Sequence, residues 1–171
     1  GGMLNRESEK ILLDIPADPS VCCHIGGGMA FETKGNLLLA TGENGQAKDG
    51  FSTIDERPGH SNADAQKSSA NTNDLRGKII RIHPEPNGTY TIPEGNLFAV
   101  GTPETRPEIY VMGVRNPWRL SVDSKTSWLY WGEVGPNGAN DVEERGPRAY
   151  DEFNQARKAG NFGYPYFVGD N

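Results

Sequence analysis

Hydrophobic residues are scarce in this sequence, and they form no long run. They make up 35% of the 171 residues, and the mean hydropathy is -0.66. No stretch approaches the roughly 20 consecutive apolar residues that a membrane-spanning helix needs. The sequence therefore predicts no transmembrane span.

Cysteine and positive charge are also scarce. The two cysteines, Cys22 and Cys23, are adjacent. Because neighbouring residues do not easily bridge each other, we expect no disulfide between them, and their count says little about the redox compartment. Lysine and arginine together number 17 against 23 acidic residues, which gives a net charge of -6. Without a basic stripe to neutralise phosphates, nucleic-acid binding is not expected.

Glycine and proline, in contrast, are abundant, with 22 and 12 residues. This composition is typical of a loop-rich β protein, and the length suffices for one domain with a core. Short β-branched, aromatic and aliphatic runs separated by turn residues indicate consecutive antiparallel strands. We expect one short helix over 150–159, ended by Gly160, and strands near 10–15, 28–32, 36–42, 77–83, 89–92, 108–114, 118–123 and 128–134.

A weak internal repeat links two of these regions. Thr41-Gly42-Glu43 follows one hydrophobic strand as Trp131-Gly132-Glu133 follows a later one. We interpret the two as equivalent β-sheet units. The segment 44–76 lies between them, is almost wholly polar and is too long for an ordinary hairpin loop. We therefore expect it to be an irregular insertion.

His24 is the first candidate for chemistry, because it lies just before Gly26-Gly27-Gly28. Backbone without side chains lets a flat ligand approach closely. A lone histidine is more often structural than catalytic, and we interpret His60 and His83 as surface residues. The glycines favour a functional role for His24 over the other two histidines.

Polar residues at strand ends supply the other candidates. Glu43 and Glu133 each follow a glycine there, where they could bind a metal or a hydroxyl group, or be solvated acids. The carbonyls of Gly135-Pro136 could bind calcium, which accepts backbone oxygens. The insert Arg115-Asn116-Pro117 interrupts two apolar runs, so its side chains point either into a cleft or into water.

These candidates stand among further motifs in a definite order. The motifs are His24-x-Gly26-Gly27, Gly35-Asn36-Leu37, Thr41-Gly42-Glu43, Leu75-Arg76-Gly77-Lys78, Ile92-Pro93, Asn96-Leu97-Phe98, Arg106-Pro107-Glu108, Arg115-Asn116-Pro117, Gly132-Glu133-Val134-Gly135-Pro136-Asn137, Tyr150-Asp151-Glu152 and Gly160-Asn161-Phe162-Gly163-Tyr164-Pro165. From about Cys22 to the C-terminus, this order resembles the glucose/sorbosone dehydrogenase family. Its members are soluble aldose dehydrogenases that depend on pyrroloquinoline quinone (PQQ) and are built as six-bladed β-propellers.

The resemblance implies an all-β chain that forms about two to three blades of such a propeller, each an antiparallel four-stranded sheet. Residues 1–171 would then be a partial domain with the polar insertion 44–76, and further blades would lie on both sides. We expect its exposed sheet edges to pair with those blades, another chain or another copy. The stretches 54–59 and 68–74 look like a subgroup found in large secreted proteins, which implies a periplasmic or extracellular location.

The resemblance also implies roles for individual residues. His24 matches the general base that takes the proton of the sugar's anomeric hydroxyl. Arg115 matches the arginine that contacts the quinone oxygens, with Asn116 beside it. Gly135 and Pro136 match the residues whose carbonyls hold the active-site calcium. The implied reaction is PQQ- and calcium-dependent oxidation of an aldose to its lactone by hydride transfer, with a cytochrome c as an electron acceptor.

Two matches carry departures from the family. Glu43 falls where the family has an aspartate near the base, and Cys23 occupies a place where a carboxylate is often seen. Glu152 matches an acid of a second calcium site. We expect the chain alone to be inactive without the remaining blades.

Two other functions fit the same sequence. A propeller without cofactor could bind carbohydrate or protein, and a calcium-dependent lactonase would need a carboxylate-rich metal centre. If the chain belongs to an oxidoreductase, His24 and Arg115 should face one cavity, roughly 5 to 10 Å apart. The alternative places His24 against its own glycine loop and pairs Arg115 with an acid such as Glu133.

Overall fold

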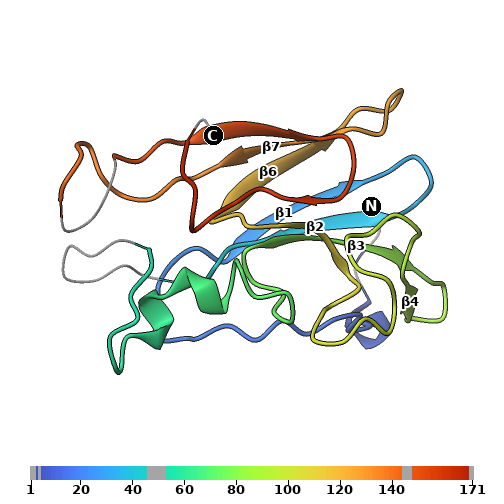
Figure 1. Cartoon of the computed structure of the whole chain (residues 1–171). Helices are drawn as coiled ribbons and strands as arrows, with labels where there is room; N and C mark the ends of the chain where they lie inside the picture. The colour runs from blue at the N-terminus through green and yellow to red at the C-terminus, as the bar shows by residue number, and fades with distance from the viewer. Residues whose placement is uncertain (1–2, 4, 46–52, 144–147, 170–171) are drawn as a thin grey trace.

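The computed structural model describes residues 3, 5–45, 53–143 and 148–169, and this part of the chain is an all-β structure of two sheets (Figure 1). The first sheet has the order β1-β2-β3-β5-β9, and β4 pairs with β3; the second has the order β6-β7-β8. All pairs are antiparallel except β5 with β9. The strands are β1 (Gly26–Phe31), β2 (Leu37–Thr41), β3 (Lys78–Pro84), β4 (Tyr90–Thr91), β5 (Ile109–Met112), β6 (Pro117–Val122), β7 (Leu129–Glu133), β8 (Glu152–Ala156) and β9 (Gly160–Asn161).

The expected four-stranded antiparallel unit is present as β1-β2-β3-β5. Its sheet has six strands in total, because β4 and β9 add to it, and the second sheet has three among the described residues. The expected strands from residue 28 to residue 134 all form, with ends within a few residues of those predicted. The antiparallel hairpins β1-β2 and β6-β7 are the two units that the internal repeat predicts.

Alternation along β2 and β3 builds two hydrophobic clusters, one on each face of the first sheet. Leu38 and Ile79 point toward the second sheet, where they pack with Leu129 and Trp131. On the opposite face, Ile80 packs in the other cluster. The first sheet is therefore covered on both faces, which explains its nearly continuous apolar strands.

The two sheets approach most closely where β1 meets β6 (Figure 1). A Cβ atom at Gly28 would lie 2.7 Å from the carbonyl oxygen of Trp118. The glycines after His24 therefore allow two strands to come together, in addition to any role beside a ligand.

The antiparallel order gathers the candidate residues at one end of the sheets. The start of β1, the end of β2, the start of β3 and the end of β5 share that end. The connection from β5 to β6 also lies there, and the end of β7 joins it because Glu133 accepts a hydrogen bond from the backbone nitrogen of Arg115.

Two expected elements are wrong. Residues 10–15 form no strand, because no described strand pairs with them; Leu12, Leu13 and Ile15 instead pack as a partly buried layer on the first sheet. The helix expected over 150–159 is the strand β8, which pairs with β7, and Gly160 begins β9. Pairing with a neighbouring strand and burial of Ala156 outweigh the helix propensity of this segment.

The described part of the polar insertion, 44–45 and 53–76, has no strand and contains the short 3-10 helices η2 (Ser61–Ala63) and η3 (Ala65–Lys67); a third, η1 (Arg6–Ser8), lies near the N-terminus. Lys78 fixes this segment to the sheet. Its buried Nζ donates to the carbonyl oxygens of Ser68, Ser69 and Arg76 at 2.7, 3.0 and 2.8 Å.

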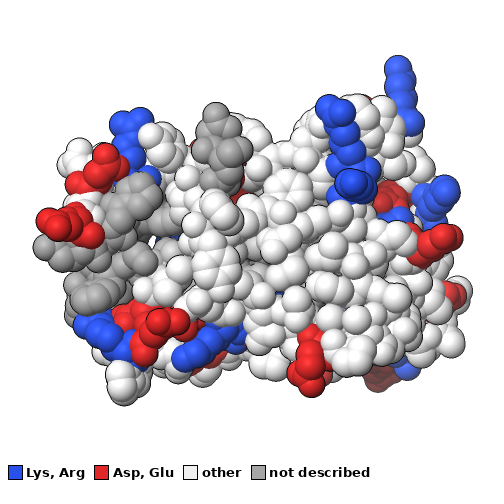
Figure 2. Space-filling view, in the orientation of Figure 1, with Lys and Arg blue, Asp and Glu red and all other residues white. Residues whose placement is uncertain are grey.

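Figure 2 shows one face of the molecule on which acidic and basic side chains lie mainly near the margins, with an uncharged central area. None of the described helices is long and apolar enough to cross a membrane.

Candidate active site

His24 lies two residues before β1 in a left-handed conformation, with a φ of 59°. Its Nδ1 is 2.8 Å from the carbonyl oxygen of Gly45 and 3.2 Å from Oε1 of Glu43. Carbonyl and carboxylate oxygens only accept hydrogen bonds, so the proton of the neutral imidazole belongs on Nδ1. The lone pair then lies on Nε2, as a general base requires.

Glu43 joins the candidate base to the candidate electrophile. It follows β2 and is buried, with 3% of its surface exposed. The same Oε1 that contacts His24 lies 3.3 Å from Nε of Arg115. The Glu43 backbone nitrogen also donates to the Arg115 carbonyl oxygen at 2.8 Å, which ties the end of β2 to the β5–β6 connection.

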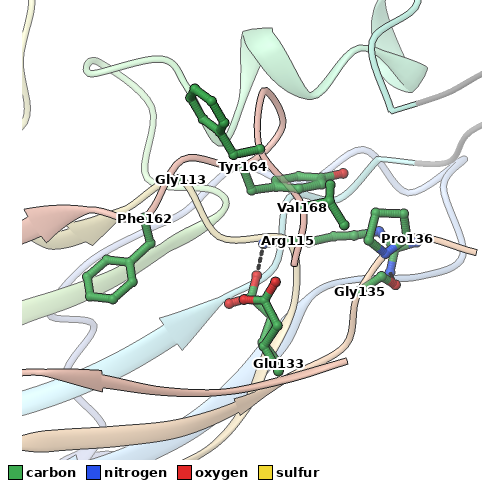
Figure 3. Close-up of a pocket in the computed structure, with 10 residues that line it drawn as sticks. Gly113, Arg115, Glu133, Gly135, Pro136, Phe162, Tyr164 and Val168 are labelled. Atoms are coloured by element: carbon green, nitrogen blue, oxygen red, sulfur yellow. Dashed lines mark hydrogen bonds between the residues drawn. The ribbon is translucent and has the colours of Figure 1, made fainter. Parts of the chain in front are cut away.

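Arg115 is equally buried and is held at several points. Its Nη1 donates to the carbonyl oxygen of Gly135 at 2.6 Å. Figure 3 shows Glu133 reaching from β7 toward the arginine backbone, while the arginine side chain extends toward Gly135 and Pro136. The two acids of the internal repeat, Glu43 and Glu133, therefore flank Arg115 from the two sheets.

Burial raises the pKa of Glu133 to about 7, and the carboxylates of Glu152 and Glu43 act in the same direction. Hydrogen bonds from Trp131 Nε1, at 2.9 Å, and from the backbone of Arg115 act in the opposite direction by favouring the ionised form. Glu133 can therefore exchange a proton close to neutral pH.

A small pocket opens beside Arg115 and Glu133 (Figure 3). Its volume of about 10 Å³ has room for one water-sized group. Pro136 and Glu152 line it together with Phe162, Tyr164, Phe167 and Val168. Glu152 accepts hydrogen bonds from the Gly169 backbone nitrogen at 2.8 Å and from the Asn154 side chain at 3.1 Å, so both of its oxygens are already engaged.

Asn116 and Gly42 lie beside this cluster. Asn116 is buried, and its Oδ1 has no hydrogen-bond partner among the described residues. A Cβ atom at Gly42 would lie 2.6 Å from that Oδ1 and would clash with the carbonyl group of His24. A side chain at position 42 would therefore disturb both His24 and Asn116.

The structure brings together His24, Glu43, Arg115 and Gly135 through direct contacts, with Asn116 alongside. Glu133 contacts the backbone of Arg115, and the arginine side chain pairs with Glu43 instead. Pro136 and Glu152 lie around the pocket. Among the described residues, no group of three or more His, Cys, Asp or Glu side chains could hold a metal ion.

Sequence reasoning missed Tyr164, whose hydroxyl donates to Oε2 of Glu43 at 2.6 Å. It is buried in the segment after β9, and its ring lies beside Arg115 and Val168 (Figure 3). The only sequence signal was its place in the Gly163-Tyr164-Pro165 motif, because a tyrosine in an aromatic turn usually indicates packing.

The expectation that Cys22 and Cys23 are unbridged is wrong. The structure joins them in a disulfide, with their Cα atoms 3.8 Å apart. The usual separation of bridged residues is larger, which is why adjacency argued against a bond. Both residues are exposed in the turn before His24, where their side chains can lie on the same side.

Comparison with known proteins supports a relationship that covers nearly the whole chain. Residues 4–171 match the family model for glucose/sorbosone dehydrogenases. Aldose sugar dehydrogenase YliI of Escherichia coli is 31% identical over 142 residues, which cover 83% of this chain and 29% of that protein. HIPL2 protein of Arabidopsis thaliana is 30% identical over 157 residues, covering 84% of this chain and 19% of that protein. The chain therefore spans less than a third of the length of these relatives.

Comparison with solved structures indicates the same relationship. An oxidoreductase (glucose dehydrogenase) of Thermus thermophilus matches with a TM-score of 0.65 and 33% identity, over 92% of this chain and 38% of that one. A PQQ-bound aldose sugar dehydrogenase of Streptomyces coelicolor matches with a TM-score of 0.58 and 26% identity, over 91% and 34%. The two sheets match part of a β-propeller like that of these enzymes, and the chain belongs to the glucose/sorbosone dehydrogenase family.

Proposed function

We propose that this chain supplies the base and a cationic side chain for the PQQ-dependent oxidation of an aldose sugar to its lactone. The observation that carries the proposal is the contact of His24 and Arg115 with one oxygen of Glu43. Because one buried acid holds both side chains, the base and the cation can act in the same reaction. The base removes a proton, and the cation stabilises the negative charge that develops. The PQQ-bound relative supports the choice of cofactor.

His24 takes the proton of the sugar's anomeric hydroxyl through Nε2, because Nδ1 is committed to Gly45 and Glu43. Once protonated, the imidazole carries a positive charge next to the Glu43 carboxylate. That carboxylate stabilises the charged form and keeps the ring in place, as in other acid-oriented histidine bases. The two-electron acceptor for the hydride that leaves the sugar carbon would be bound PQQ.

The residues around Arg115 fit an anionic cofactor in part. Arg115 is a buried cation, and such a charge stabilises negative charge that develops during a reaction. Oδ1 of Asn116 has no hydrogen-bond partner among the described residues, but it is buried and closely packed, since a Cβ atom at Gly42 would lie 2.6 Å from it. The pocket beside Arg115 has room only for a water-sized group. Other residues would therefore have to form the rest of a PQQ site.

Calcium fits less well. The Gly135 carbonyl oxygen, its expected ligand, accepts from the Arg115 guanidinium, so a calcium ion there would lie next to a positive charge. We therefore assign no step to calcium.

We infer a periplasmic or extracellular location, because a disulfide such as Cys22–Cys23 persists in oxidising compartments. An electron acceptor such as a cytochrome c would reoxidise the cofactor.

The test uses the polypeptide that contains this chain, loaded with PQQ and assayed with aldoses and an artificial electron-accepting dye. We expect sugar-dependent dye reduction that requires PQQ. His24→Ala should lower turnover by about 10²-fold or more and leave PQQ binding largely intact, whereas His83→Ala serves as the control. Binding of carbohydrate without PQQ-dependent turnover would instead identify a non-catalytic module.

A further inference from the structure

The Glu43 carboxylate can face the Arg115 guanidinium in more than one orientation. The observed orientation is not the one that pairing with Arg115 alone would favour. Arginine and a carboxylate usually form two parallel hydrogen bonds in a fork. Here a single oxygen, Oε1, faces Nε of Arg115 at 3.3 Å and is shared with His24. Another group must hold Oε2 away from the guanidinium.

Tyr164 is that group. Its hydroxyl donates to Oε2 of Glu43 at 2.6 Å, and a side-chain hydrogen bond with Thr53 engages the same hydroxyl. The Tyr164 backbone nitrogen donates to the Gly113 carbonyl oxygen at 3.0 Å, which fixes the residue beside the β5–β6 connection that carries Arg115. The tyrosine is therefore held independently of the acid it contacts.

Burial raises the pKa of Tyr164 well above its ordinary value, and the charge of Glu43 acts in the same direction. The phenol therefore keeps its proton across the working pH range. Its hydroxyl is a constant donor to Glu43, so the direction of this hydrogen bond does not change with pH.

We propose that Tyr164 is a positioning residue for the base: by holding Oε2 of Glu43, it keeps Oε1 between His24 and Arg115. Without the hydroxyl, Glu43 turns toward Arg115 and forms the fork. His24 then keeps only the Gly45 carbonyl beside its Nδ1, and it loses the carboxylate that stabilises the protonated ring. The consequence for turnover depends on the proposed function, whereas the effect on His24 does not.

The test compares Tyr164→Phe with Tyr166→Phe in the polypeptide that contains this chain. Both changes remove one hydroxyl from the same segment, but Tyr166 is exposed and donates to Gln66, at 3.0 Å. We expect Tyr164→Phe to lower kcat by about 10- to 100-fold with little change in the KM for sugar, as for a misplaced catalytic group. Tyr166→Phe should keep the wild-type kcat.

Proton NMR of the His24 ring provides a measurement that needs no activity. The Nδ1 proton of His24, held by the Gly45 carbonyl next to the Glu43 carboxylate, should give a separate downfield signal. That signal should lie at the same position in the wild type and in Tyr166→Phe, and should move upfield in Tyr164→Phe, where only the Gly45 carbonyl remains beside the proton. An unshifted signal in folded Tyr164→Phe overturns the proposal, and so does an equal shift in both variants. If wild type has the signal but oxidises no sugar, the proposed function fails and the positioning role stands.

A second variant covers the case in which Tyr164→Phe does not fold. Glu43→Asp shortens the acid by one methylene group, so a carboxylate still held by Tyr164 cannot reach both His24 and Arg115. We expect the Nδ1 signal of this variant to move upfield as well. An unshifted signal in Glu43→Asp would show that Tyr164 does not determine where the acid lies.

Discussion

Arg115 and Gly135 follow different strands and are joined by a hydrogen bond of 2.6 Å from the guanidinium Nη1 to the carbonyl oxygen. This bond and the Glu43 contact use two different nitrogens of one planar group. Lysine carries its donors on one terminal nitrogen, so it cannot reproduce the spacing of Nε and Nη1. The guanidinium therefore adds a side-chain link between the segments after β2 and β7 to the contacts that Glu43 and Glu133 make with the backbone of residue 115.

Arg115→Lys should consequently lower the free energy of unfolding by about 2 kcal/mol, because one buried acceptor loses its donor. Urea denaturation measures this change. Arg119→Lys is the matched control, since Arg119 is exposed on β6 and should change stability very little. Equal effects of the two substitutions would contradict the structural role of Arg115.

Lys78→Met should destabilise the chain by about 3 kcal/mol, because it removes the donor to three backbone carbonyls. Methionine keeps the length of the side chain, so the loss reports on hydrogen bonds and not on a cavity. Lys125→Met, at an exposed turn, is the control. Thermal and urea unfolding should both show the difference, and a variant as stable as the control would remove Lys78 as the anchor of the insertion.

The stability contributed by Lys78 should also depend on pH. Burial lowers the pKa of Lys78 to about 7, below its ordinary value of 10.5. Between these values the unfolded chain binds more protons than the folded one, so this contribution to stability rises as pH increases through that window. The difference in unfolding free energy between wild type and Lys78→Met should therefore widen from pH 7 to pH 10. A difference that is constant or narrows with rising pH contradicts this.

Asp55 should affect stability at acid pH. The Arg57 guanidinium holds its pKa well below the usual range, through hydrogen bonds of 2.8 and 2.7 Å. Its contribution is therefore present above the ordinary carboxyl value of 3.8 and lost as the pH falls below it. Asp55→Asn should be less stable than wild type near neutrality, and the gap should close in acid. The exposed Asp14→Asn should show no such gap at any pH.

Much of the fold could be predicted because strand and turn residues alternate clearly. Leu38 and Ala40 face one side of β2, and the turn at Gly35 separates it from β1. The segment 150–159 could not be predicted in the same way. Its Glu, Gln, Ala, Arg and Lys residues favour a helix, and only the neighbouring strand β7 makes it a strand. Such tertiary pairing leaves no local trace in a sequence.

Residues of the candidate site could be predicted from the sequence, but the contacts between them could not. His24, Glu43 and Arg115 were identified from their motifs, and the structure shows that one carboxylate oxygen connects them. Tyr164 was missed because its contact with Glu43 spans 121 positions, and no spacing rule reaches so far. Lys78 was missed for a related reason, since a lysine at the start of a strand gives no sign that it will be fully buried.

The central claim is that His24 is the base. Its most direct test is a single-turnover experiment in the absence of oxygen and of an electron-accepting dye. The PQQ-loaded polypeptide that contains this chain is mixed with excess aldose, and the absorbance of the bound quinone is followed in a stopped-flow spectrometer. We predict rapid conversion to the reduced form in the wild type, and conversion at least about 10²-fold slower in His24→Ala with the cofactor still bound. Equal rates in the two proteins would show that His24 is not the base.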